Sequence, residues 1–187
     1  MSRQNTFLVI WATVAVVIAL SGKYDGIPAC GIQATIGVQM LVFLLFITGS
    51  AVFREHLLSL NLAHLTMFHV WRILPGATFL YFHYKLGLLP WSFAVPGGYG
   101  DIAVGITAVF ASKLVKTGHP QVLLAWQMLA LLDLLNVIRA GLVNGINQPA
   151  SMMPLTHLPL NLLPLMMVPL TLMAHVAAIY ILIRKKL

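Results

Sequence analysis

Four ionisable side chains lie within long apolar runs of the sequence: Arg72, Asp101, Asp133 and Arg139. A charge inside a membrane is costly, so an ionisable residue at that depth is a candidate functional residue. Two bases and two acids can offset one another, and pairing makes buried charge tolerable. With Asn136, three residues after Asp133, they form a candidate site for a small polar or anionic solute, in which Arg72 supplies a hydrogen-bonding fork.

The spacing of these residues predicts which of them meet. Asp133 and Asn136 share a helix face, whereas Arg139 lies six residues beyond Asp133 and points elsewhere. Asp133 therefore needs a partner from another helix, and Arg72 matches its depth near mid-membrane. A buried salt bridge that only fixes helix register is the alternative to a binding site.

Asp101 and Arg139 are expected nearer the outer surface. Asp101 follows the glycine-rich stretch 97–100 and is predicted to cap the start of a helix, with a role in the site as the alternative.

Two histidines raise a redox alternative. His69 and His175 are predicted at matching depths on the third and sixth helices, as a bis-imidazole haem b site requires. Arg72 would then hold a haem propionate or a quinone oxygen. Neutral histidines hydrogen-bonded in the core are the simpler interpretation, and we expect no cofactor. Metal-ligand clusters are absent from the sequence, and the single cysteine, Cys30, excludes a disulfide framework or a CxxC pair.

Several functional classes leave no trace in the sequence. It contains no Walker loop, no dinucleotide-binding glycine fingerprint and no GxSxG nucleophile elbow, so no catalytic residue is predicted. Lys and Arg are dispersed at the ends of apolar segments and form no basic stripe, which argues against nucleic-acid binding.

The composition predicts the elements that position these side chains. Of 187 residues, 60% are hydrophobic and 8% charged, too few charges to cover a water-soluble domain. A bilayer core needs about 20 apolar residues per helix. We therefore predict an all-α fold, a polytopic bundle of six transmembrane helices in one domain over 1–187. The predicted helices cover about 5–22, 34–53, 61–83, 100–116, 121–143 and 163–184.

The distribution of Lys and Arg predicts the orientation, because positively charged loops stay in the cytoplasm. One side holds Arg3, Arg54, Lys113, Lys116, Arg184, Lys185 and Lys186. The other side holds only Lys23 and Lys85, with Arg139 near that end of the fifth helix. Six spans with both termini in the cytoplasm satisfy this asymmetry.

Two segments depart from regular helices. On the third predicted helix, His69, Arg72, Gly76, Phe79 and His83 share a face that should point into the bundle, and Pro75-Gly76 should bend the helix just after Arg72. The proline-rich segment 148–164 is predicted to be an extended lid over the outer helix ends, with a re-entrant functional loop as the alternative.

The central half of the chain resembles a known group. It reads Leu89-Pro90, Phe93-Ala94, Pro96-Gly97-Gly98, Gly100-Asp101-Ile102 and Val104-Gly105, followed by Leu131-Leu132-Asp133-Leu134. This is similar to small uncharacterised bacterial integral membrane proteins with an LPxxFAxPAGxGD(I/L)xVG segment and a later LLDL segment, here with a glycine in place of the usual alanine. The resemblance implies a multi-pass protein of the bacterial inner membrane and interest in Asp101 and Asp133, but no substrate, cofactor or reaction.

Three functional hypotheses remain open at this stage. The first is binding or transport of a small polar or anionic solute through Arg72, Asp101, Asp133, Asn136 and Arg139. The second is a haem b or quinone redox protein. The third is an accessory subunit whose apolar and small-residue faces pack within a homo-oligomer or a larger complex in the lipid bilayer.

Overall fold

The computed structural model describes residues 3–185, and within them every regular element is helical. The long helices are α1 (Arg3–Leu20), α2 (Ala29–Gly49), α6 (Trp91–Thr117), α7 (Pro120–Asn147) and α9 (Val168–Lys185). The shorter elements are α3 (Ala51–Ser59), α4 (Leu62–Phe68), the 3-10 turn η1 (His69–Arg72), α5 (Ile73–Tyr84), α8 (Pro149–Met152), the 3-10 turn η2 (Met153–Thr156) and the π-helical turn η3 (Leu163–Met167).

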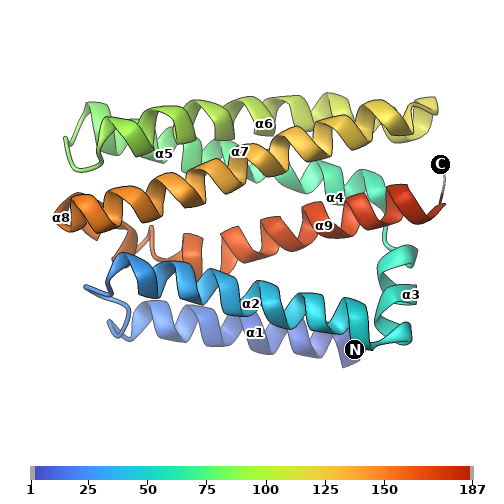
Figure 1. Ribbon diagram of the computed structural model, residues 1–187, viewed down its shortest axis with the longest axis horizontal. Helices are drawn as coiled ribbons and strands as arrows, with labels where there is room; N and C mark the ends of the chain where they lie inside the picture. The colour runs from blue at the N-terminus through green and yellow to red at the C-terminus, as the bar shows by residue number, and fades with distance from the viewer. Residues whose placement is uncertain (1–2, 186–187) are drawn as a thin grey trace.

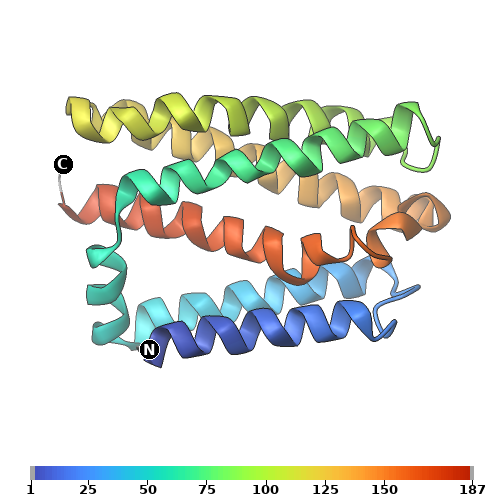
Figure 2. The same cartoon turned by 180° about the vertical axis from the view of Figure 1, so that it is seen from behind.

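The helices run side by side along the long axis of the molecule (Figures 1 and 2). The connections 21–28, 85–90 and 148–162 gather at one end, which we call the loop end. The other end, which we call the terminal end, holds α3, the α6–α7 connection and the end of α9. Helix α3 lies across this terminal end, crosswise to the long helices (Figure 1).

Four helices are long and apolar enough to cross a membrane, at Cys30–Gly49, Trp91–Thr117, Pro120–Asn147 and Leu163–Lys185, and Ile10–Leu20 is a shorter apolar helix. Large apolar side chains cover the outside of the bundle, for example Leu74, Phe110 and Leu129. Several polar side chains are buried inside instead. An apolar exterior around a polar interior suits a protein whose solvent is lipid.

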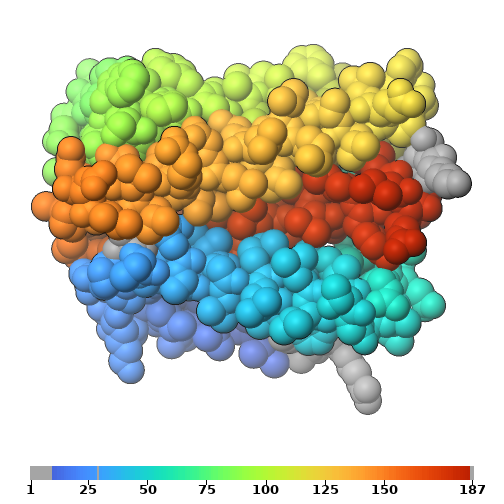
Figure 3. All heavy atoms as spheres, viewed as in Figure 1, coloured from blue at the N-terminus to red at the C-terminus, as the bar shows by residue number. Residues whose placement is uncertain are grey.

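Helix α9 occupies the centre of the bundle. It packs against α7, α4, α2 and α3, and its buried face includes Thr171, His175, Ala178 and Ile181. On the face seen in Figure 3, α9 reaches the surface between α7 and α2 mainly over its C-terminal half. Side chains on its inner face are therefore shielded on several sides by other helices.

Glycines bring α5 and α6 into close contact. A Cβ atom at Gly76 would lie 2.6 Å from the carbonyl oxygen of Gly98, and one at Gly105 would lie 3.0 Å from the backbone nitrogen of Ile73. Small residues let membrane helices approach closely without a hydrophobic driving force. Asp101, Gly105, Ala108 and Ser112 recur at helical spacing on one face of α6, and all four are buried.

Helix α6 corrects the predicted start at residue 100. It begins at Trp91 and carries Pro96, Gly97 and Gly98 inside the helix. Proline and glycine are tolerated in membrane helices because neighbouring groups satisfy the freed backbone. Asp101 is therefore not an N-cap, and α6 extends further toward the loop end than predicted.

The other boundaries differ less. The second predicted helix starts at Ala29 and ends at Gly49, where Ser50 separates it from α3 and accepts a hydrogen bond from the backbone nitrogen of Phe53. The third covers 62–84, but its irregular turn, η1, comes before Pro75 and Gly76. The proline-rich segment is folded into short helical turns rather than extended, and it buries Met152, Leu155 and Leu160 against α5, α6 and α7.

Candidate functional site

The 3-10 turn η1 directs the side chains of His69 and Arg72 into the bundle. Asn61 caps α4 by accepting hydrogen bonds from the backbone nitrogens of Ala63 and His64, and the backbone tightens to 3-10 geometry over His69–Arg72. His69 is fully buried and Arg72 is 1% exposed. The predicted inward face is confirmed for these two residues and for Gly76 and Phe79.

Arg72 binds two carboxylates and a carbonyl. Its Nε donates to Oδ1 of Asp101 at 2.6 Å, and its Nη2 donates to Oδ2 of Asp133 at 2.5 Å. Nη1 donates to the carbonyl oxygen of Ala130 at 3.1 Å. The predicted contact between Arg72 and Asp133 is thus confirmed. Every nitrogen of the guanidinium already has a protein acceptor, a fork geometry that suits arginine.

The two acids differ in their exposure. The side chain of Asp101 is 5% exposed, whereas that of Asp133 is 25% exposed. Gly100 makes this arrangement possible, because a Cβ atom at residue 100 would collide with the carboxylate of Asp133. Asp133 is therefore the more accessible acid of the trio, and Asp101 anchors the arginine from the inside.

Asp101 lies at the depth of Arg72, not near the surface as predicted, because α6 begins nine residues before the predicted start at residue 100. The structure does not bring Asn136 and Arg139 into this cluster. Both are exposed on α7, and Oδ1 of Asn136 accepts hydrogen bonds from Nε and Nη2 of Arg139 at 3.3 and 3.1 Å.

The predicted neutral set of four charges is therefore incomplete. Arg72 faces two carboxylates, so the cluster carries one excess negative charge when both acids are ionised.

His69 and His175 form a second buried group, close to Arg72 along η1. Their rings stack with centroids 3.8 Å apart and 16° between the ring planes. Both side chains are fully buried. Nδ1 and Nε2 of His69 and Nε2 of His175 have no hydrogen-bond partner. The predicted match in depth is confirmed, and the pair retains unused donor and acceptor capacity.

Two residues that the sequence analysis missed extend this group. Nδ1 of His175 lies 2.6 Å from Oε1 of Gln127, whose Nε2 donates to Oγ1 of Thr66 at 3.2 Å. Gln127 and Thr66 are fully buried. A polar side chain inside an apolar run is the signal that marks Gln127 in the sequence, because such a group requires a partner within the bundle.

The histidine pair does not fit a haem b site. Two imidazoles that bind one haem iron approach it from opposite faces of the macrocycle. The rings of His69 and His175 instead lie face to face, and a centroid separation of 3.8 Å leaves no room for a macrocycle between them. Each nitrogen of Arg72 also donates to a protein acceptor already, so a propionate or quinone oxygen would have to compete with these acceptors.

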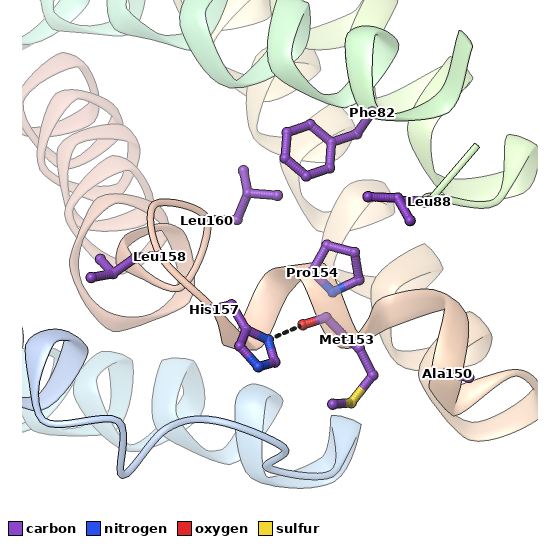
Figure 4. Close-up of a pocket in the computed structure, with 8 residues that line it drawn as sticks. All are labelled: Phe82, Leu88, Ala150, Met153, Pro154, His157, Leu158 and Leu160. Carbon is purple, nitrogen blue, oxygen red and sulfur yellow. Dashed lines mark hydrogen bonds between the residues drawn. The ribbon is translucent and has the colours of Figure 1, made fainter. Parts of the chain in front are cut away.

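An open pocket of about 360 Å³ lies at the loop end (Figure 4), and none of the three charged residues of the cluster lines it. Its walls come from α5, residue 88 and the proline-rich segment, and they include Phe82, Met153 and Leu160. His157 borders it, and Nδ1 of that ring lies 3.0 Å from the carbonyl oxygen of Met153. None of the five predicted ligand-binding residues lines this pocket.

Comparisons with known proteins identify a family but no activity. Residues 29–183 match the family described as a domain of unknown function (DUF8737). Neither a curated protein nor a solved structure matches the chain. The matched segment contains Arg72, both acids, both stacked histidines and Gln127. Together, these polar side chains can hold a charged or hydrogen-bonding species within an apolar bundle.

Proposed function

The chain belongs to the DUF8737 family, and we propose that it binds a small polar solute, for transport, at the Arg72–Asp101–Asp133 cluster of a multi-pass protein in the bacterial inner membrane. The carrying observation is a charged trio in which one acid, Asp133, remains a quarter exposed. An intramembrane ionisable residue that is open on one side is a candidate solute contact.

The proposal includes six spans with both termini in the cytoplasm. Segment 62–84 is helical throughout and roughly 35 Å long at 1.5 Å per residue, enough for a bilayer core of about 30 Å. Together with α1 and the four long apolar helices it would give six crossings. The terminal end carries Arg54, Lys116 and Arg184, which supports a cytoplasmic location for that end; Lys186 lies outside the described residues.

The charge balance favours a cationic solute over an anionic one. Each nitrogen of the Arg72 guanidinium already donates to a protein acceptor, so an anion would have to compete with the two carboxylates for it. A cation or an ammonium donor would instead offset the excess negative charge at Asp133. Offsetting a buried charge is favourable because an uncompensated one is costly in an apolar interior.

Thermal unfolding of the purified protein in mild detergent tests this proposal. A ligand that binds only the folded protein stabilises it, by about 2.7 kcal/mol at a hundred times its dissociation constant. Methylammonium is the cationic probe and inorganic phosphate the anionic one. We expect methylammonium to raise the unfolding midpoint, and Asp133→Asn to abolish the increase.

Glu55→Gln is the matched control, because Glu55 is exposed on α3 and its loss removes the same charge away from the cluster. It should leave the methylammonium effect unchanged. An increase with phosphate that requires Arg72, or a methylammonium effect that survives in Asp133→Asn, would overturn the proposed site.

A further inference from the structure

Buried hydrogen bonds determine which ring nitrogen of His175 carries the proton. Oγ1 of Thr66 donates to the carbonyl oxygen of Leu62 at 2.9 Å, so this hydroxyl must accept from the amide nitrogen of Gln127. The carbonyl oxygen of that amide then faces His175 and accepts from its Nδ1–H. Nε2 of the neutral ring is left with a lone pair and no partner.

The histidine pair can therefore take up a proton. The lone pair on Nε2 of His175 is one acceptor, and neutral His69 offers another on one of its two unpartnered nitrogens. Two positive charges on rings stacked at 3.8 Å, beside Arg72, would repel strongly. The pair thus has room for one proton and not for two.

The charged trio requires one compensating positive charge. Arg72 contributes one positive charge and the two acids contribute two negative charges when ionised. Among the side chains that the structure describes, the ion pairs formed are those of Arg72 with Asp101 and Asp133. Other groups packed around the histidines are uncharged, namely Gln127 and Trp126 on α7 and Thr66 on α4, and His64 on α4 is exposed.

We infer that the Arg72–Asp101–Asp133 trio and the stacked His69–His175 pair together hold one exchangeable proton, which the cationic solute displaces. The proton can occupy two positions, a carboxyl of the acid pair or a ring nitrogen of the histidine pair. When it moves, a carboxylic acid becomes a carboxylate and a neutral imidazole becomes an imidazolium. The five groups remain neutral overall in both states.

Binding of a monovalent cation at Asp133 would supply the compensating charge itself, so the proton would be released. The protein would then exchange a proton for a cationic solute. Chains of acids and histidines within spans are a recurrent form of proton relay in pumps and transporters. The identity of the exchanged solute rests on the proposed function, whereas the shared proton rests on the buried charges alone.

The test follows the ring nitrogens directly. In a variant with the other five of the seven histidines replaced by Gln, the stacked pair contains the only imidazoles, so neither ring needs to be mutated. The protein is labelled with isotope-enriched histidine, and NMR in detergent distinguishes a lone-pair nitrogen, an N–H and an imidazolium. Spectra are recorded across about pH 5 to 8, where histidine charge normally changes.

We expect an imidazolium signal that grows to no more than one ring of the two as the pH falls. Asp133→Asn neutralises the trio without a proton, so the imidazolium population should fall severalfold. Glu55→Gln should leave it unchanged. Two neutral rings across the whole range, two charged rings at once, or no effect of Asp133→Asn would overturn the shared proton.

Adding methylammonium separates this inference from the proposed function. A lower imidazolium population on addition supports both. If the titration is as expected but neither methylammonium nor Na⁺ changes it, the cationic solute site fails while the shared proton stands. If Na⁺ stabilises the protein through Asp133 while both rings remain neutral, a metal cation and not a proton balances the charge, and the inference is wrong.

Discussion

At the scale of single residues, Arg72 is the group on which the interior depends. It is fully enclosed, and its three nitrogens bind Asp101, Asp133 and the carbonyl oxygen of Ala130. Removing one partner of a buried ion pair leaves an uncompensated charge, a loss of about 3–5 kcal/mol. The exposure of Asp133 makes its own loss less severe, because solvent or headgroups can reach it.

Arg72→Gln is therefore expected to lower the free energy of unfolding by about 3–5 kcal/mol, and Asp133→Asn by clearly less. Unfolding in mixed detergent micelles, followed by circular dichroism, gives both values. The double variant Arg72→Gln/Asp101→Asn should recover part of the loss, because it removes a base and an acid together. Equal losses for the two single variants would contradict the difference in burial.

Gly100→Ala is the sharpest steric test of the site. The added methyl group would collide with the carboxylate of Asp133, and overpacking of this kind costs about 1–3 kcal/mol. The midpoint of thermal unfolding should fall, together with the methylammonium effect.

Gly37→Ala on α2 is the control, because nothing lies within 4 Å of a Cβ atom there. Similar behaviour of the two variants would mean that helix propensity, and not contact with Asp133, governs the result.

The site was predictable in part from single residues. The partnership of Arg72 and Asp133 followed from depth and charge, and the structure confirms it. Asp101 was misplaced because glycines and a proline before it were interpreted as a loop. Arg139 was assigned to the cluster from charge balance alone, although its helix position already directed it elsewhere. Gln127 was missed because the candidate site was built around ionisable groups, and Gln127, unlike Asn136, does not lie one helical turn from one of them.

At the scale of elements, the tight contact between α5 and α6 determines where Asp101 lies. Gly76 and Gly98 face one another across this contact with no room for a side chain. The sequence predicted helices with small faces, but not that the glycine-rich stretch would itself be helical. Propensities measured in water disfavour glycine and proline within a helix, and these penalties weigh less where lipid forces the backbone to satisfy its own hydrogen bonds.

Gly76→Ala is expected to force α5 and α6 apart and to lower the free energy of unfolding by about 1–3 kcal/mol. The obstacle is the backbone carbonyl of Gly98, which cannot rotate away as a side chain could. Gly49→Ala at the end of α2 has open space around it and serves as the control. A neutral effect of Gly76→Ala would show that the helices separate without cost.

At the scale of the whole molecule, the connections between the helices gather at two opposite ends, the loop end and the terminal end. The six predicted segments are largely helical because hydropathy marks long apolar helices, although α6 begins earlier than predicted and α3 was not predicted as a separate helix. The fold of the proline-rich segment was not predicted either, since its short turns are set by burial of Met152, Leu155 and Leu160 against other helices. Such packing is a property of the assembled bundle and leaves little local pattern.

Cysteine labelling tests the proposed orientation. In a Cys30→Ser background, Lys23→Cys places a thiol at the loop end and Thr117→Cys places one at the terminal end. A membrane-impermeant maleimide should label the first in intact cells and the second only after the membrane is permeabilised. Labelling of Thr117→Cys in intact cells would invert the topology, and labelling of both would exclude six spans.

The position of Arg72 also has a consequence for how the chain enters the membrane as it is synthesised. Segment 62–84 carries Arg72 and three histidines, and an arginine at the centre of a helix opposes insertion by about 2.5–3.5 kcal/mol. Both acids that neutralise it lie on α6 and α7, which leave the ribosome later. We therefore expect stable insertion of this segment to depend on the arrival of its partners, so that these three helices enter the lipid as one group.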